Sequence, residues 1–162
     1  MKKAICPGSF DPVTMGHLDI IRRASNMFDE VVVAVMNNSA KVSTFTIEKR
    51  MDFIERALSD AKNVTVGTFS GLLIDYCREI NASAIVKGLR AISDYEYEVQ
   101  IALLNKNLDC GIETVFLTSA QEYMFLSSSI VREVGRYGGD ITKFVHPLLH
   151  DEIKCRLCLN TI

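Results

Sequence analysis

Five short runs of apolar residues, many of them β-branched, alternate with amphipathic segments along this chain. The runs are residues 3–6, 31–36, 64–67, 84–87 and 114–117. Each run is almost entirely apolar, which is typical of strands that are covered on both faces. Strands that alternate with helices favour a parallel sheet with right-handed crossovers and helices on both faces. The sequence therefore predicts an α/β fold with a doubly wound, five-stranded parallel sheet.

The amphipathic segments between the runs predict the helices. In the first of them, Leu18, Ile21, Ala24 and Phe28 recur at helical spacing, so we expect a helix over residues 17–28. Capping signals mark two other helix starts. Thr46 precedes the second expected helix, and Ser93 with Glu96 forms a capping box before the fourth. The next three expected helices cover residues 46–59, 72–80 and 93–108. A fifth falls in the segment 126–139, where Gly138 and Gly139 stop it, and a short turn and a final helix follow near the C-terminus.

The composition indicates a compact protein with a small-molecule ligand. With 162 residues and 48% hydrophobic composition, the chain suits one core, so we expect a single domain over residues 1–162. The 18 Lys and Arg against 20 Asp and Glu give no basic excess of the kind that nucleic-acid or membrane binders carry. The longest apolar run, residues 31–36, is far too short to cross a bilayer. We expect a cytoplasmic protein with neither a nucleic-acid nor a membrane partner.

The five cysteines are an odd number, which suits reduced thiols in the cytoplasm. Cys155 and Cys158 follow His146 and His150 in the pattern H-x3-H-x4-C-x2-C, and these residue types bind zinc. The gap between the two pairs is short, and both pairs also fit one face of a helical tail. We therefore favour a helical tail over a zinc site and expect no metal ligand among the side chains.

The stretch CPGSFDPVTMGH, Cys6–His17, follows the first run and contains several turn-forming residues. A tight strand-to-helix connection with Thr14 as cap would explain it. In a parallel sheet, this connection lies where ligands bind, near the point at which strand order reverses. The amides of Met15, Gly16 and His17 would then be free to attract an anion. The stretch predicts a phosphate site, although it has neither a Walker A nor a G-x-G-x-x-G motif.

His17 is the candidate catalytic group of this stretch. Its imidazole would stand near the phosphate and could donate a hydrogen bond as negative charge builds on an oxygen. A surface histidine at a helix start is the alternative. Other cations and hydroxyls share the same sheet edge: Lys41 after the second run, Lys87 and Arg90 around Gly88 immediately after the fourth, and Ser127, Ser128 and Ser129 after the fifth.

No Ser-His-Asp grouping, HExxH motif or catalytic carboxylate pair can be assembled from the sequence. A site of cations and amides without a strong base suits an attacking oxygen that is already ionised at pH 7. The attack of one phosphate on another is such a reaction.

These blocks, in this order, resemble those of the bacterial phosphopantetheine adenylyltransferases, a family of the nucleotidyltransferase superfamily. The resemblance covers nearly the whole chain and rests on three segments: residues 6–17, with the TxGH signature Thr14–His17, residues 87–108 and the SSSIVR block at residues 127–132. It implies a Rossmann-like nucleotidyltransferase fold with a helical C-terminal tail. It also implies that ATP and 4'-phosphopantetheine give dephospho-coenzyme A and pyrophosphate, the penultimate step of coenzyme A biosynthesis.

The resemblance further implies direct in-line attack without a covalent intermediate, Mg²⁺ bound mainly through the ATP phosphates, a homohexamer, and coenzyme A as a feedback ligand. His17 would stabilise the transition state. The residues that it implies for ATP are Ser9, Phe10, His17, Gly88, Leu89, Arg90, Glu98, Tyr123, Met124, Phe125, Leu126, Ser127, Ser128 and Ser129. Those that it implies for 4'-phosphopantetheine are Ser9, Lys41, Leu73 and Lys87.

The chain departs from the family pattern at three positions. Lys87 stands where many relatives have arginine, so the charge is kept and the bidentate fork is lost. Cys6 and Tyr123 stand where other members often have Tyr and Trp. Two alternatives stay open: another small-molecule nucleotidyltransferase of the superfamily, acting on nicotinamide mononucleotide or glycerol phosphate, and a non-catalytic nucleotide-binding module.

Overall fold

The computed structural model describes residues 2–36, 42–90 and 92–158. Its sheet has five strands: β1 (Lys3–Gly8), β2 (Glu30–Met36), β3 (Val64–Phe69), β4 (Ala84–Leu89) and β5 (Glu113–Thr118). All neighbouring strands pair in parallel, in the order β3-β2-β1-β4-β5. This confirms the predicted doubly wound sheet. The strand order reverses between β1 and β4, and the turn after β1 lies at this switch point.

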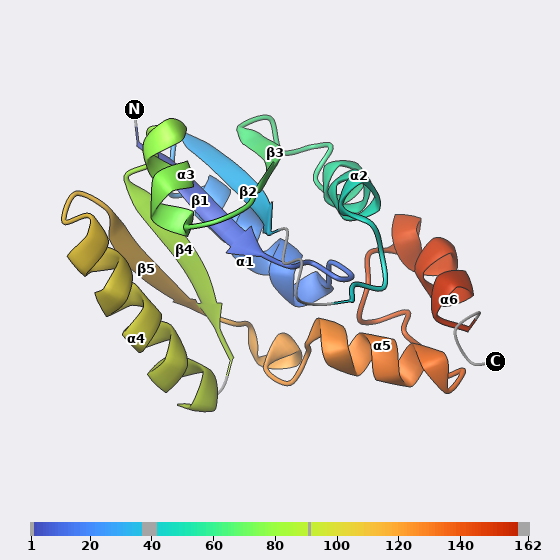
Figure 1. Cartoon of the computed structure of the whole chain (residues 1–162). Coiled ribbons are helices and arrows are strands. Elements are labelled where there is room, and N and C mark those ends of the chain that lie inside the picture. The colour runs from blue at the N-terminus through green and yellow to red at the C-terminus, as the bar shows by residue number, and fades with distance from the viewer. Residues whose placement is uncertain (1, 37–41, 91, 159–162) are drawn as a thin grey trace.

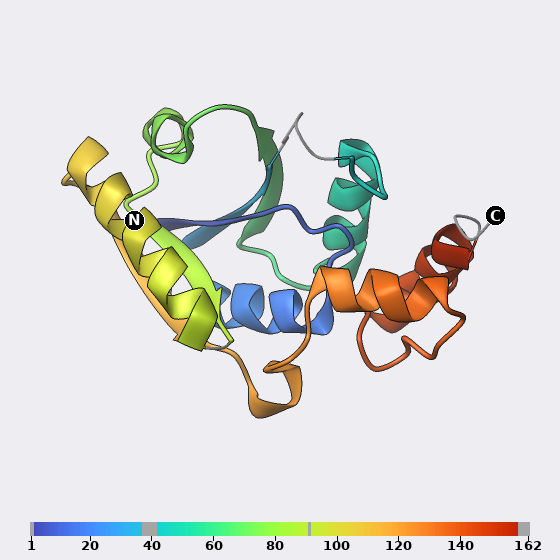
Figure 2. The same cartoon turned by 60° about the horizontal axis from the view of Figure 1, so that its bottom comes forward.

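The helices are α1 (Met15–Ser25), α2 (Ile47–Ala57), α3 (Leu73–Glu79), α4 (Ile92–Leu108), α5 (Ser128–Arg136) and α6 (His150–Cys158), with two 3₁₀ turns, η1 (Gln121–Tyr123) and η2 (Pro147–Leu149). Helices α1 and α2 cover one face of the sheet, and α3 and α4 cover the other (Figures 1 and 2). None of the helices in the three described ranges is long and apolar enough to span a bilayer.

Alternate residues of β1 supply the two cores, because side chains of a strand point to opposite faces. Ala4 and Cys6 belong to the core under α1 and α2, and Ile5 belongs to the core under α3. Buried residues of α5 and α6, including Val131 and Ile153, extend the first core beyond the sheet. Figure 1 shows α6 beside α2 and α5 next to α6, past the carboxyl ends of the strands. In the turn after β1, Phe10, Asp11 and Thr14 are buried, whereas Ser9 is exposed.

Several predicted boundaries need correction. Strand β4 continues to Leu89, because Lys87, Gly88 and Leu89 keep their register with β5. Lys87 and Gly88 thus lie within the strand, and Arg90 is the first residue after it. Helix α4 begins at Ile92, so Ser93 lies inside the helix instead of before it. The turn η1 was not predicted.

Candidate active site

The turn between β1 and α1 has a special backbone at Phe10. Phe10 has φ 48°, in the left-handed region that residues other than glycine rarely adopt, and the Asp11–Pro12 peptide is cis. The Phe10 ring lies over Gly8, where an added Cβ would come within 2.9 Å of the ring. The same ring meets His17 edge-on, with 5.1 Å between the ring centroids. Gly8 therefore makes room for Phe10, and Phe10 supports the His17 imidazole.

Thr14 fixes the orientation and tautomer of His17. The Thr14 backbone N–H donates to Nδ1 of His17 at 3.0 Å, and Oγ1 of Thr14 accepts from the His17 backbone N–H at 3.4 Å. This arrangement confirms Thr14 as the cap of α1. Because Nδ1 accepts a hydrogen bond, the proton of the neutral ring is on Nε2.

The His17 ring is neutral at physiological pH. Burial, followed by the positive charges of Arg90 and Lys87, lowers the pKa of His17 from 6.5 to about 4. A neutral imidazole with its proton on Nε2 donates one hydrogen bond and carries no charge of its own. His17 is thus built as a hydrogen-bond donor among fixed cations.

One expectation about this helix start is wrong. The Met15 N–H donates to the Phe144 carbonyl at 2.9 Å, and the His17 N–H is taken by Thr14. Two of the three amides expected to attract an anion are therefore already bonded. The positive potential of the site comes mainly from side chains.

Two adjoining cavities, of about 230 and 330 Å³, meet at Ser9, His17 and Arg90, which line both. The smaller one, the β4 cavity, is also lined by Cys6, Pro7, Gly8, Phe10, Thr14, Gly16, Ile20, Ile21, Val86, Lys87, Gly88, Glu98, Ser119 and Leu126. The larger one, the α5 cavity, is also lined by Asp11, Met36, Val42, Ser43, Arg50, Ser127, Ser128, Ser129 and Arg132. His17 thus stands where the two spaces join.

The β4 cavity contains a pair of opposite charges. Nζ of Lys87 lies 3.3 Å from the Glu98 carboxylate, and both side chains are partly buried. At the same edge, Arg90 donates to the Leu126 carbonyl at 2.9 Å. Burial raises the pKa of the Cys6 thiol to about 12, so this cysteine stays protonated and packs as an apolar group.

The α5 cavity is more cationic, because Arg50, Arg90 and Arg132 all line it. Ser127 caps α5 by accepting from the Ile130 N–H at 3.2 Å, which confirms the predicted serines at a helix start. The positive end of the α5 dipole therefore also faces this space. The guanidinium groups of Arg90 and Arg132 and a helix N-terminus suit an anion with several charges, such as a phosphate chain. Arg50 is buried and adds positive potential.

Most of the predicted site residues come together at these cavities. Ser9, Phe10, His17, Lys87, Gly88, Arg90, Glu98 and Leu126 line the β4 cavity, and the three serines line the α5 cavity. The residues that line neither are Leu73, Leu89, Tyr123, Met124 and Phe125. Lys41 lies outside the described residues. Tyr123 still packs at the helix start, since an added Cβ on Gly16 would come within 3.3 Å of it.

Asp11, Arg50 and Arg132 line the α5 cavity without having been assigned a role from the sequence. A signal existed for Arg50. It is three residues after Ile47 and four before Ile54, so it falls on the apolar face of α2. A charged residue at such a position indicates a buried, bonded side chain.

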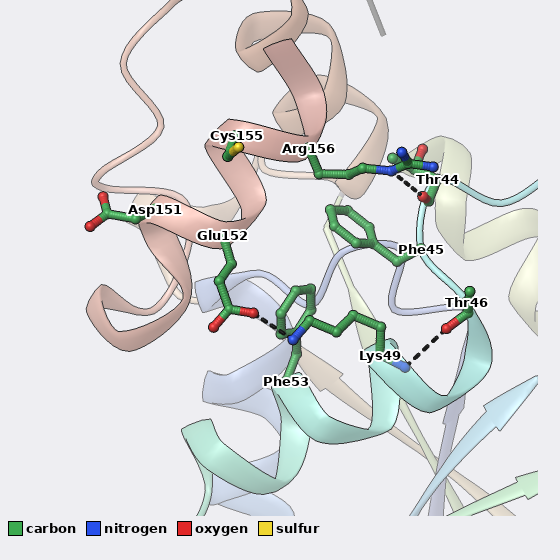
Figure 3. A pocket seen from close by; sticks show the side chains of 9 residues that line it. All are labelled: Thr44, Phe45, Thr46, Lys49, Phe53, Asp151, Glu152, Cys155 and Arg156. Carbon is green, nitrogen blue, oxygen red and sulfur yellow. Dashed lines mark hydrogen bonds and ion pairs between the residues drawn. The ribbon is translucent and has the colours of Figure 1, made fainter. Parts of the chain in front are cut away.

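A cavity of about 720 Å³ between α2 and α6 contains none of the predicted site residues (Figure 3). Phe45 and Phe53 form its floor, and Lys49 pairs with Glu152 across it at 2.5 Å. Its two cations are engaged, Lys49 with Glu152 and Arg156 with the Thr44 carbonyl, and much of its lining is apolar. The cations that converge on one space, Lys87, Arg90 and Arg132, line the other two cavities.

Three of the four candidate zinc ligands of the C-terminal tail make other contacts in the structure. His146 accepts from the Leu148 N–H, His150 pairs with Asp151, and Cys158 contacts the Gly135 carbonyl. Among residues 2–36, 42–90 and 92–158, no group of three or more His, Cys, Asp or Glu side chains could hold a metal ion. The tail is helix α6, as favoured from its spacing.

Known proteins resemble this chain over most of its length. Residues 5–134 match the family model described as cytidylyltransferase-like. The chain is 52% identical over 157 residues to the phosphopantetheine adenylyltransferase of Streptomyces coelicolor, covering 97% of this chain and 98% of that protein.

Solved structures show the same fold at much lower identity. Nicotinic acid mononucleotide adenylyltransferase of Plasmodium falciparum, complexed with NaAD, superposes with a TM-score of 0.74 at 17% identity, over 100% of this chain and 99% of that one. The same enzyme complexed with APC superposes with a TM-score of 0.73 at 17% identity, over 99% of this chain and 98% of that one. These neighbours confirm the Rossmann-like nucleotidyltransferase fold. Because it is 52% identical to the Streptomyces enzyme over 97% of its length, the chain belongs to the phosphopantetheine adenylyltransferase family of cytidylyltransferase-like nucleotidyltransferases.

Proposed function

We propose that this protein transfers the adenylyl group of ATP to 4'-phosphopantetheine, which gives dephospho-coenzyme A and pyrophosphate. The observation that carries the proposal is the location of His17, a neutral donor at the junction of two cation-lined cavities. A phosphate in each cavity would bring the two reacting groups together at this imidazole. The family relationship supports the choice of substrates.

In the proposed reaction, an oxygen of the 4'-phosphopantetheine phosphate attacks the α-phosphorus of ATP in line. The new P–O bond forms as the bond to the β-phosphate bridging oxygen breaks, and pyrophosphate leaves with that electron pair. The attacking oxygen is ionised at neutral pH, so no general base is required. No covalent intermediate with the enzyme forms.

The Nε2–H group of His17 would donate a hydrogen bond to a non-bridging oxygen of the transferred phosphoryl group. This bond strengthens as negative charge builds, which is the requirement for lowering the barrier. Arg90 and the α5 serines would contact the ATP phosphates, with Arg50 and Arg132 adding positive potential. The nucleotide would also meet Phe10, Gly88, Leu89, Glu98 and the segment from Tyr123 to Leu126.

Lys87 and Lys41 would bind the phosphate of 4'-phosphopantetheine, Ser9 would contact the phosphates on both sides of the transfer, and Leu73 would contact the pantetheine arm. Lys87 is held by Glu98 in the structure. Substrate phosphate would therefore compete with a carboxylate for this ammonium group.

The carboxylates at the site suit a magnesium ion that arrives on ATP. Asp11 is already bonded to two backbone amides, and Glu98 is paired with Lys87. Phosphate oxygens and water would therefore supply most of the Mg²⁺ ligands, with Ser9, Arg90 and the serines holding the phosphates themselves. When bound, the ion neutralises phosphate charge.

We further propose a homohexamer in the cytoplasm, with coenzyme A as a feedback ligand. Helix α4 supports assembly, because Tyr95, Tyr97, Leu103, Leu104 and Leu108 are all exposed on it. Apolar surface of this extent on one helix is typical of a protein interface. The apolar side chains of α4 would be covered by neighbouring subunits.

The test is pyrophosphate release by the purified protein with Mg²⁺, ATP and 4'-phosphopantetheine, with dephospho-coenzyme A identified by mass. Nicotinamide mononucleotide with ATP, and glycerol phosphate with CTP, serve as the alternative substrate pairs. Turnover confined to 4'-phosphopantetheine supports the proposal. Faster turnover with another pair would assign a different transferase, and ATP binding without any turnover would indicate a binding module.

A further inference from the structure

Asp11 and Arg50 are two buried ionic side chains that join the turn after β1 to the segment that enters α2. We propose that they act as positioning residues, which together hold Ser9, Phe10 and His17 in register with the α5 cavity. The expected effect on kcat rests on the proposed function. The contacts themselves are independent of it.

Asp11 connects the turn to two other parts of the chain. Its side chain is buried, and the two carboxylate oxygens accept from the Thr44 N–H and the Phe45 N–H, each at 2.9 Å. Arg132 of α5 lies 3.8 Å from one of these oxygens and also donates to the Asp11 backbone carbonyl. Charge-assisted bonds of this kind are among the stronger hydrogen bonds in proteins.

Arg50 connects α2 back to the turn after β1. It reaches from α2, is 3% exposed, and donates to the Ser9 carbonyl at 2.7 Å through Nη1. Nη1 also lies 3.4 Å from the Met36 carbonyl at the end of β2, and Nε lies 3.4 Å from the Thr46 carbonyl. One planar guanidinium thus ties the ends of β1 and β2 to the start of α2.

The two connections flank Phe10. Arg50 holds the residue before it and Asp11 is the residue after it, while Phe10 itself keeps a left-handed backbone at φ 48°. Such a conformation persists only where the surroundings hold it. Since the Phe10 ring packs against the His17 imidazole, a change in the Phe10 backbone would move the support of the proposed catalytic donor.

A role in stability alone explains these side chains poorly. Buried ionic groups add little net stability over well-packed apolar residues of similar size, although removing one partner is costly. Their effect on the reaction rate can be much larger, because a shift of about 1 Å at a reacting centre lowers rates by about 100-fold. The contacts of Asp11 and Arg50 act at the residues where such a shift would matter.

The test uses Asp11→Asn, Arg50→Met and Arg50→Lys in the full-length protein. We expect kcat to fall by about 10- to 100-fold in Asp11→Asn and Arg50→Met, with the ATP affinity of Asp11→Asn within about threefold of that of the unsubstituted protein. Arg50→Lys keeps a donor for the Ser9 carbonyl and should fall in between. Should Arg50→Met fail to fold, Arg50→Lys and Asp11→Asn decide the outcome.

Arg22→Met is the matched control. Arg22 also joins two parts of the chain, with bonds to the Ala57 carbonyl and to Asp60, but it lines neither cavity. Its loss should lower the thermal midpoint and leave kcat unchanged below that temperature. Folded Asp11 and Arg50 variants with kcat like that of the control would overturn the proposal.

A second measurement needs no substrate. Nitrogen-15 NMR of the His17 imidazole should show the Nε2–H tautomer in the unsubstituted protein and in Arg22→Met. In Asp11→Asn and Arg50→Met we expect the two nitrogen shifts to move toward each other as tautomers mix. Unaltered shifts would refute the positioning role even if kcat changes. If the unsubstituted protein transfers no adenylyl group to 4'-phosphopantetheine, the proposed function fails alone, and the NMR result still decides this inference.

Discussion

The ammonium group of Lys87 lies 3.3 Å from the Glu98 carboxylate, and both line the cavity that contains His17. Lys87 comes from β4 and Glu98 from α4, so the pair connects a strand to the helix that follows it. In the proposed function Lys87 serves 4'-phosphopantetheine and Glu98 serves ATP. If Lys87 and Glu98 have these roles, the ion pair couples the two substrate sites.

Glu98→Gln should change the affinities for the two substrates in opposite directions. Removing the carboxylate frees Lys87 for phosphate, so the affinity for the pantetheine substrate should rise by up to about fivefold, the size of a partly exposed ion pair. The affinity for ATP should fall, because a ligand of the nucleotide is lost. Calorimetric titration with each substrate in turn measures both. Lys87→Met is the control that should weaken binding of the pantetheine substrate, and weaker binding in Glu98→Gln as well would contradict the coupling.

His17→Ala should remove most of the catalysis while leaving ATP bound. In the proposed mechanism the imidazole donates a hydrogen bond that strengthens in the transition state, and the loss of such a donor raises the activation free energy by about 3 kcal/mol or more. Single-turnover assays and ATP titration by calorimetry measure the two effects separately. Turnover equal to that of the unsubstituted protein would remove His17 from the mechanism.

The pH dependence of stability should carry the signature of His17. Burial, and then Arg90 and Lys87, lower its pKa to about 4, below its ordinary value of 6.5. The unfolded chain therefore takes up a proton between these two pH values when the folded protein does not. The contribution of His17 to the free energy of unfolding is therefore complete above about pH 6.5 and decreases as the pH falls toward 4.

Urea unfolding at pH 7.5, 6 and 5 measures this effect against His17→Gln, which cannot titrate in this range. We expect the loss of unfolding free energy between pH 7.5 and 5 to be larger in the unsubstituted protein than in the variant. Equal losses in both proteins would mean that the His17 pKa is not depressed.

Gly88→Ala should destabilise the contact between β4 and α1. An added Cβ would come within 2.8 Å of Cγ1 of Ile20, which is buried. Overpacking of this kind typically costs about 1–3 kcal/mol of unfolding free energy. Chemical unfolding measures it, and Gly88→Ala combined with Ile20→Ala should lose less than the sum of the single effects. If the two losses of unfolding free energy add exactly, the cost of Gly88→Ala does not arise from contact with Ile20.

Features set by neighbouring residues were predicted well from the sequence. Thr14, Thr46 and Ser127 were expected at helix starts and do cap α1, α2 and α5, because a cap depends on three or four successive residues. The parallel arrangement of the strands also follows from the alternation of strands and helices together with the handedness of crossovers.

Features set by distant residues were missed. Strand β4 runs past Lys87 because β5 pairs with it, and the Met15 amide is taken by Phe144, more than a hundred residues away. The contacts of Arg50 with Ser9 and of Asp11 with Thr44 are likewise long-range. A linear pattern indicates that such side chains are buried without indicating what they bond.

The exposed apolar side chains of α4 make assembly testable with two substitutions. Leu103 and Leu104 are 62% and 55% exposed, which is unusual for adjacent leucines in a folded chain. If α4 forms a subunit contact, Leu103→Glu with Leu104→Glu places two like charges in an apolar interface, where burying each unpaired charge is strongly unfavourable. Light scattering after gel filtration should show six chains for the unsubstituted protein and a smaller assembly for the variant.

Asn107→Glu adds a charge at an exposed polar position of the same helix and should leave the mass unchanged. The circular dichroism of all three proteins should agree, since none of these side chains belongs to either core. A six-chain assembly that survives both leucine substitutions would exclude this face of α4 from the subunit contacts. An unsubstituted protein that runs as a single chain would refute the hexamer itself.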